Sequence, residues 1–221
     1  MNDVKDFTTV RITFSKSGRA RYISHLDLNR TMIRALRRAE LPIWYTEGFN
    51  KHPYVTFAAP LSLGFEGERE TMDVRLNEAY DMDELVRRLD AVMPQGLRVL
   101  SAAIAVKKAG EVDRAVYELR VGCTRGEVES FLASPTIIVQ KRAKKKTMKE
   151  VDLVPVLSGS ASSLQEGEDG TVWQLTLPCN STDSINPSLV VEALRTFLKR
   201  EEMPCFVRRL AVLDKAGHPF L

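Results

Sequence analysis

Cysteine, histidine and tryptophan are scarce in this chain of 221 residues, which has only three cysteines, three histidines and two tryptophans. The cysteines, Cys123, Cys179 and Cys205, are too few and too widely spaced for a disulfide framework or a CxxC metal site. We therefore expect them to be reduced thiols in the core or on the surface.

Long hydrophobic segments are also missing. No run approaches the about 20 apolar residues that cross a bilayer. The N-terminal segment MNDVKDFTTV lacks both the cationic start and the apolar stretch of a signal peptide. Apolar residues make up 44% and charged residues 28% of the chain, which is ordinary for a soluble globular protein. We expect a cytoplasmic protein that does not associate with membranes.

The net charge of +3 is small, but the basic residues are unevenly distributed. Six arginines lie between Arg19 and Arg38, and six further basic residues lie between Lys141 and Lys149. Such local concentrations of positive charge favour an anionic partner.

Hydrophobic periodicity predicts two consecutive sets of elements. In the first set we expect extended segments at residues 8–14, 43–46, 54–59, 71–76 and 97–105, with helices at 24–41 and 83–93. In the second we expect extended segments at 115–123, 137–141, 150–156, 171–177 and 206–213, helices at 125–133 and 186–202, and a mobile polar loop at 158–170. Each set is close to β-α-β-β-α-β, so the predicted fold class is α+β, with two ferredoxin-like halves in tandem at residues 1–109 and 110–221.

The first predicted helix has the strongest functional signal. Ser24 is a good N-cap, with Asp27 at the third helical position, and Pro42 follows the helix. Arg30, Arg34 and Arg37 follow at helical spacing and form a candidate phosphate-binding face. The alternative is an ordinary solvated face opposite the apolar stripe.

A second compact motif, EGFNKHP, begins at Glu47. Phe49 and Tyr54 provide aromatic rings on which nucleic-acid bases can stack, although either ring can equally be a core anchor. The full set of candidate nucleic-acid-binding residues is Arg21, Arg30, Arg34, Arg37, Phe49, Asn50, Lys51, Tyr54, Lys144, Lys145 and Lys146. The three lysines belong to a basic segment that we interpret as an auxiliary arm on the nucleic-acid backbone.

His25 and His52 are the candidate catalytic pair. Two histidines can share acid and base roles in RNA cleavage, and with Asp27 they could also form a metal site, which we rank lower because Asp27 already caps the helix. Structural hydrogen bonding of both rings is the third possibility. A shared site requires the chain to carry His52 back to the helix start. We expect this to happen, with residues 43–46 forming the strand parallel to the first; if that strand began at Tyr54 instead, the two histidines would lie far apart.

Several strings resemble the radical SAM-linked, or radical SAM-associated, proteins, an uncharacterised family defined by a domain of unknown function. They are YISHLDLNRTMIRALRRAELPI, EGFNKHPYVTFAAPLSLG, ERETMDVRL and KKKTMKEVDLVP, and together they span most of the chain. The family pattern usually has GFNPHP where this chain has Lys51 in place of the proline. The resemblance implies a radical SAM protein as partner. A looser likeness of fold pattern links the chain to CRISPR repeat-processing endoribonucleases.

The chain itself lacks the CxxxCxxC motif that holds a radical SAM iron–sulfur cluster. We therefore expect no cofactor and no metal in this chain, with the cluster and S-adenosylmethionine carried by the partner. Our hypothesis is an RNA-binding accessory protein that works with a radical SAM enzyme in RNA modification or processing. The alternatives are a metal-independent endoribonuclease and a protein-binding adaptor for the radical SAM partner.

Overall fold

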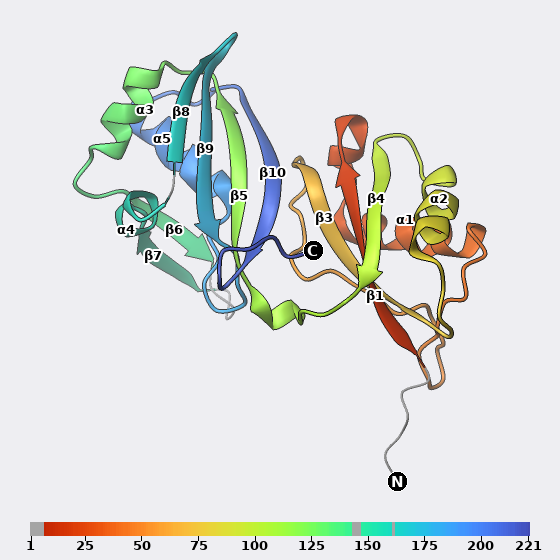
Figure 1. The fold of residues 1–221 in the computed structure, drawn as a ribbon. Helices are drawn as coiled ribbons and strands as arrows, with labels where there is room; N and C mark the ends of the chain where they lie inside the picture. The colour runs from red at the N-terminus through yellow and green to blue at the C-terminus, as the bar shows by residue number, and fades with distance from the viewer. Residues whose placement is uncertain (1–6, 143–146, 161) are drawn as a thin grey trace. The chain divides into compact units, whose positions relative to one another are not determined.

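The computed structural model describes residues 7–142, 147–160 and 162–221, a mixed α/β arrangement with five α-helices in that part of the chain (Figure 1). The chain forms two compact units. The first contains the chain up to Val112 together with Ala211–Leu221, and the second contains Asp113–Leu210.

The first unit is built on an antiparallel sheet. Strand β1 (Thr8–Lys16) lies between β4 (Leu97–Ile104) and β3 (Glu66–Leu76), and the two-residue strand β2 (Val55–Thr56) pairs with β3. Every one of these pairs is antiparallel. The order is therefore β4-β1-β3-β2.

Helices α1 (His25–Arg38) and α2 (Met82–Ala91) pack into this unit's hydrophobic core. The apolar stripe of α1 packs into that core because its members recur every three or four residues, on one face of the helix. It consists of Leu28, Met32, Ala35 and Leu36, all buried. As predicted, Ser24 caps α1, and its Oγ accepts a hydrogen bond of 3.1 Å from the backbone N–H of Asp27.

Residues 44–54, which we call the hairpin, interrupt the outer strand beside β3. Ile43 bridges to Leu76, and the pairing resumes where Val55 lies opposite Val74. The predicted extended segments at 43–46 and 54–59 are confirmed in part, because residues 43 and 45 form β-bridges and the second segment contains β2. Within the hairpin, residues 44–46 pair with residues 52–54, through the backbone hydrogen bond from Thr46 N–H to the His52 carbonyl, 2.9 Å long.

The C-terminal segment of the first unit covers the sheet face opposite the helices. The buried Arg11 side chain forms a two-pronged ion pair with Asp73, at 2.8 and 2.9 Å. The Phe220 ring lies 3.9 Å from the Arg11 guanidinium carbon. Lys107 Nζ forms an ion pair of 2.6 Å with Asp214. These contacts attach residues 211–221 to β1 and to the segment that follows β4.

In the second unit the paired strands follow the order β10-β5-β9-β8, with helices α3 (Arg125–Leu132) and α5 (Pro187–Leu198). The strands are β5 (Val112–Val121), β8 (Ser162–Gly167), β9 (Gly170–Pro178) and β10 (Cys205–Asp214), and the end of β10 from Ala211 onward belongs to the first unit. Strands β6 (Ile138–Arg142) and β7 (Met148–Asp152) form a separate antiparallel pair.

Two predictions for the second unit are wrong. The segment predicted as a loop at 158–170 contains β8, which tolerates polar residues because it is an exposed strand at the edge of the sheet, paired with β9. The segment predicted as extended at 150–156 ends earlier, because a short helix, α4 (Val154–Ser158), begins there. The Asp152 carboxylate accepts the backbone N–H of Val154 at 3.0 Å and stops the strand.

Candidate nucleic-acid interface

Helix α1 presents three exposed arginines at helical spacing, Arg30, Arg34 and Arg37. Arg30 is weakly paired with Asp27, at 3.4 Å, and both side chains are more than half exposed. Within the described part of the chain, Arg34 and Arg37 have no ion pair with a carboxylate. Their charge therefore stays available to an external anion.

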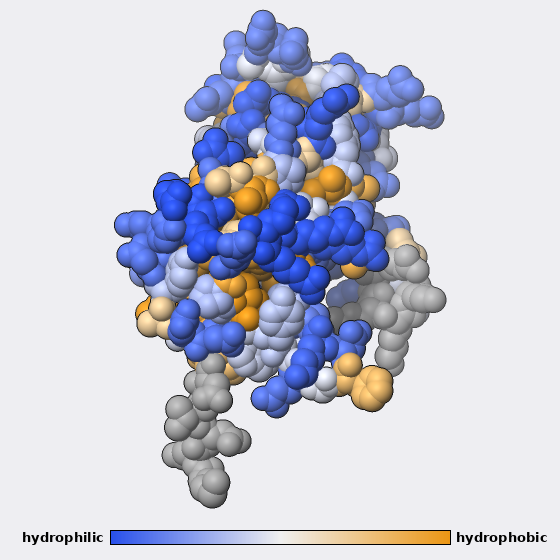
Figure 2. All heavy atoms as spheres, turned by 90° about the vertical axis from the view of Figure 1, so that its right-hand side faces the viewer, coloured by the Kyte–Doolittle hydropathy of each residue, from blue (hydrophilic) through white to orange (hydrophobic). Residues whose placement is uncertain are grey.

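Three other arginines of this unit are paired with carboxylates. Arg87 is paired with Glu84 at 2.6 Å, Arg88 with Glu40 at 3.3 Å, and Arg98 with Asp90 at 2.8 Å. Figure 2 views the side of the molecule on which α1 and α2 lie in Figure 1, and shows a broad group of hydrophilic side chains there. Arg34 and Arg37 thus lack the carboxylate partners that these three arginines have, while Arg38 of the same helix donates to the Val92 carbonyl at 2.8 Å.

The hairpin lies at the C-terminal end of α1. The Arg37 guanidinium carbon is 5.9 Å from the centre of the Tyr45 ring, which belongs to the first arm of the hairpin. At the tip, Gly48 has a backbone φ of +106°, a conformation that favours glycine. The Phe49 side chain that follows is fully exposed, at 111% of its reference area, and Lys51 is exposed as well.

Three aromatic rings surround the Arg75 side chain at the base of the hairpin. The Arg75 guanidinium carbon lies 3.8 Å from the Tyr54 ring centre, 3.9 Å from that of Phe7 and 5.0 Å from that of Trp44. Tyr54 was a candidate for base stacking, and one face of its ring is instead covered by Arg75. We call Arg75 with these three rings the arginine cage.

His52 is part of the hairpin's internal bonding. Its Nδ1 lies 3.0 Å from the carbonyl oxygen of Asn50 and 3.2 Å from the Thr46 hydroxyl. Because a carbonyl can only accept, this geometry places a proton on Nδ1. His52 and the Asn50 backbone thus stabilise the turn that presents Phe49.

His25 has other neighbours. Its ring packs edge-on against Phe57, with ring centres 5.0 Å apart. Partial burial and the nearby positive charge of Lys16 lower the pKa of His25 below its usual value. Lys16 itself is 1% exposed, and its Nζ donates to the Ile23 carbonyl at 3.4 Å.

The two histidines lie at different ends of α1. His25 is its first residue, whereas the hairpin touches Arg37, twelve residues further on or about 18 Å along the axis. The register explains this placement: the hairpin leaves the sheet beside Leu76, opposite the start of β1, and His25 follows the end of β1. The structure brings Arg37 and the hairpin together, but not His25 and His52.

The remaining candidates are dispersed. The Arg21 guanidinium donates to the hydroxyl of Tyr22 and lies 4.6 Å from that ring's centre. The three lysines Lys144, Lys145 and Lys146 fall outside the described residues. Beside them, Lys141 of β6 has a loose ion pair of 3.8 Å with Asp183 in the second unit.

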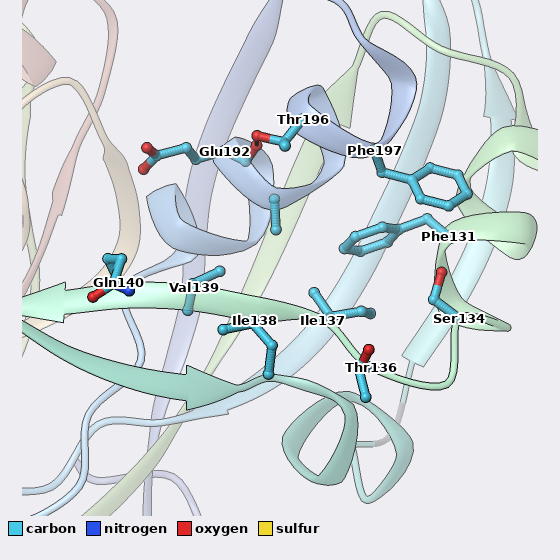
Figure 3. A pocket seen from close by; sticks show the side chains of 11 residues that line it. Phe131, Ser134, Thr136, Ile137, Ile138, Val139, Gln140, Glu192, Thr196 and Phe197 are labelled. Carbon is cyan, nitrogen blue, oxygen red and sulfur yellow. Dashed lines mark hydrogen bonds between the residues drawn. The ribbon is translucent and has the colours of Figure 1, made fainter.

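The second unit contains a cavity of about 300 Å³ that no sequence motif indicated. Figure 3 shows Phe131 and Phe197 near each other in its wall, with their ring centres 5.6 Å apart. Ile137 and Val139 of the same wall are buried, and the exposed Glu192 adds a carboxylate. None of the predicted site residues lines this cavity, and its carboxylate does not suit a polyanion.

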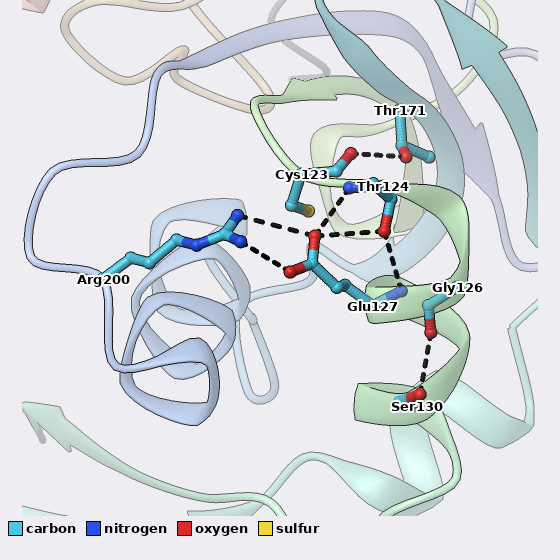
Figure 4. Close-up of polar contacts among 7 residues, drawn as sticks. All are labelled: Cys123, Thr124, Gly126, Glu127, Ser130, Thr171 and Arg200. Carbon is cyan, nitrogen blue, oxygen red and sulfur yellow. Dashed lines mark hydrogen bonds and ion pairs between the residues drawn. The ribbon is translucent and has the colours of Figure 1, made fainter.

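Hydrogen bonds and an ion pair fix the start of α3 in the second unit (Figure 4). Thr124 and Glu127 form a capping box, and Arg200 donates to the Glu127 carboxylate at 2.6 Å. Hydrogen bonding to the Thr124 backbone lowers the pKa of Glu127. Burial raises the pKa of Cys123, and it raises that of Cys205 to about 11, so neither thiol is activated as a nucleophile.

Among the described residues, no group of three or more histidines, cysteines or carboxylates is arranged to hold a metal ion. Within the same part of the chain, no helix has the length and apolar character needed to cross a membrane.

Sequence reasoning found α1 and the hairpin tip but missed the arginine cage. Phe7, Trp44 and Arg75 are distant in sequence, and only the pairing of β3 with the outer strand brings them together. The sequence of β3 contains one signal for this cage, because the charged Arg75 lies between the apolar, buried residues Val74 and Leu76.

The fold and the surface together define a mixed α/β protein with an arginine-bearing helix and a projecting aromatic hairpin. The chain belongs to the bacterial family described as "Uncharacterized protein conserved in bacteria (DUF2344)", whose model matches residues 9–187. A search of the curated proteins found no match.

Proposed function

We propose that this protein binds RNA through a surface formed by Arg30, Arg34 and Arg37 together with the tip of the hairpin, Phe49 and Lys51. One observation carries the proposal. Arg34 and Arg37 are exposed and lack a carboxylate partner among the described residues, while Arg87, Arg88 and Arg98 each have one. Guanidinium groups bind phosphate with two parallel hydrogen bonds, so such a pair at helical spacing suits a phosphate backbone.

The role we propose is that of an accessory protein which presents RNA to a radical SAM enzyme. The support for this partner is the resemblance of the motif strings around α1 and the hairpin to radical SAM-associated proteins. The iron–sulfur cluster and S-adenosylmethionine would then be bound by the partner. The endoribonuclease alternative stays a prediction from the sequence, and the separation of His25 from His52 does not favour a shared reaction centre.

We also infer that each unit is ferredoxin-like. In the first unit, the order β4-β1-β3-β2 with antiparallel neighbours is that of two interleaved β-α-β units. In the second, the order β10-β5-β9-β8 repeats this arrangement, with β6, β7 and α4 inserted after α3. This inference would place α1 on one face of a small rigid sheet.

The test is the double variant Arg34→Ala/Arg37→Ala. Removing two phosphate contacts should weaken binding of a fluorescein-labelled single-stranded RNA and lower the slope of log affinity against log salt by about 1.4. Fluorescence anisotropy over a range of salt concentrations measures both. The matched control is Arg87→Ala/Arg125→Ala, which removes the same charge from two exposed arginines already paired with glutamates.

Equal affinity and slope in the double variant and the wild type would contradict RNA binding by this surface. The same variants also test whether the protein binds a radical SAM partner. A tagged wild-type chain should co-purify with an iron–sulfur protein from its own bacterium. Loss of that protein from the double variant, with RNA binding unchanged, would support the adaptor alternative instead.

A further inference from the structure

Phe49 is the most exposed large hydrophobic residue among those described, at 111% of its reference area. It lies at the tip of the hairpin, where neither the turn nor the sheet needs an aromatic side chain. An isolated exposed ring contributes nothing to the core, but it offers two free faces for stacking. Its neighbours along the chain, Asn50 and Lys51, are polar or charged and are exposed as well, so they do not extend the ring into an apolar patch.

The hairpin that carries Phe49 is fixed at both ends. At its base, Trp44 and Tyr54 pack around Arg75 in the arginine cage. Nearer the tip, the Thr46 hydroxyl accepts the backbone N–H of His52 at 3.2 Å. A ring presented on a preformed turn loses little conformational freedom on binding, which favours affinity.

The charges near the ring define what it can bind. Lys51 lies two residues from Phe49 in the sequence. Arg37 lies beside the hairpin, because its guanidinium contacts the ring of Tyr45. A ligand that combines phosphates with a flat aromatic surface satisfies both features. In duplex RNA the bases stack on one another and their faces are hidden, whereas a single strand exposes them.

We infer that the hairpin selects single-stranded RNA, with an unpaired base stacked on Phe49 and the adjoining phosphates on Lys51 and Arg37. This inference rests on the proposed function, because it names the class of RNA that the same surface binds. Base stacking on an aromatic side chain tolerates any base, so the selection is for strandedness and not for sequence.

The experiment compares a labelled single-stranded RNA of about 12 nucleotides with the same strand annealed to its complement. Phe49→Ala should weaken binding of the single strand roughly 5- to 150-fold, as expected for loss of one stacked base, and should leave duplex binding unchanged. Phe49→Trp should retain the wild-type affinity. Leu63→Ala, which shortens another exposed apolar side chain of the same unit, is the matched control.

The outcomes separate the two proposals. If Phe49→Ala binds the single strand as well as the wild type does, while Arg34→Ala/Arg37→Ala binds it less well, the stacking inference is overturned and RNA binding stands. If neither variant changes RNA affinity, the proposed function fails as well. Equal loss of single-strand and duplex binding in Phe49→Ala would also overturn the inference, because duplex RNA offers no base face to the ring.

Discussion

His25 lies outside the proposed RNA-binding surface, but its lowered pKa makes the stability of the protein depend on pH. Folding places its ring against Phe57 and near the buried Lys16, and both effects disfavour the charged imidazolium. The folded-state pKa is therefore lower than the unfolded one. Below the unfolded value of about 6.5, the unfolded chain binds more protons at this position, so stability falls as the pH falls.

We predict that His25→Gln reduces the loss of stability between about pH 7.5 and about pH 5.5. Urea denaturation at the two pH values measures this loss as a shift of the unfolding midpoint. In the wild type, the ¹H resonance of the His25 ring, assigned by its absence from the variant, should titrate below the value of an exposed histidine. The explanation is wrong if wild type and variant lose the same stability on acidification.

At the residue scale, local signals were enough to predict part of the candidate interface. Ser24 and Asp27 mark the start of α1, and the spacing of Arg34 and Arg37 predicts that both lie on one helical face. These inferences depend only on residues within a few positions of one another. Whether the arginines are neutralised could not be predicted, because the carboxylates that pair with other arginines come from separate parts of the chain, as Glu40 does with Arg88.

At the scale of elements, the hairpin shows why extended segments are harder to predict than capped helices. The sequence of residues 43–59 favours extended backbone throughout, but it does not reveal that residues 44–54 pair with each other while Ile43 and Val55 pair with β3. The same reason applies to β8, whose polar sequence becomes a strand only because β9 offers an edge.

The arginine cage makes a prediction about the hairpin as an element. Replacing Arg75 by methionine should loosen the packing of Trp44, because the cation–π contacts of a guanidinium contribute about 0.5–2 kcal/mol each and require its planar charge. Acrylamide should then quench more of the tryptophan fluorescence. The change reports Trp44, since the second tryptophan, Trp173, is 0% exposed.

Arg87→Met is the control for the Arg75 variant, because it makes the same substitution at an exposed position on α2. Arg75→Lys should give an intermediate result, since it keeps the charge and loses the flat surface. Unchanged quenching in Arg75→Met would mean that the three rings hold the hairpin without the arginine.

At the scale of the whole molecule, the chain passes from the first unit into the second and returns for its last eleven residues, Ala211–Leu221. No local pattern predicts this return, because the segment packs against the buried charge of Arg11, which is more than a hundred positions away in the sequence. Arg11 is 2% exposed, and its guanidinium is covered by Phe220 and held by Asp73. Losing a partner or the cover of such a buried charge is costly, because the charge is then left uncompensated.

This dependence yields a prediction for the full-length protein. Phe220→Ala should destabilise the first unit by about 3–5 kcal/mol, the usual cost of removing a buried phenylalanine ring, and it should expose Arg11 to water. Hydrogen exchange followed by mass spectrometry should show faster exchange in peptides from β1 and β3. Peptides from β5 and β9, which belong to the second unit, should exchange as in the wild type.

Phe220→Leu separates the two contributions of the ring, because leucine restores most of the apolar cover without the cation–π contact. It should therefore lose less stability than Phe220→Ala. Because Lys107 still binds Asp214 in both variants, the segment should remain attached and the change should be confined to the Arg11 site. Equal acceleration of exchange in β1 and β9 would show that the C-terminal segment stabilises the molecule as a whole, and would contradict its assignment to the first unit.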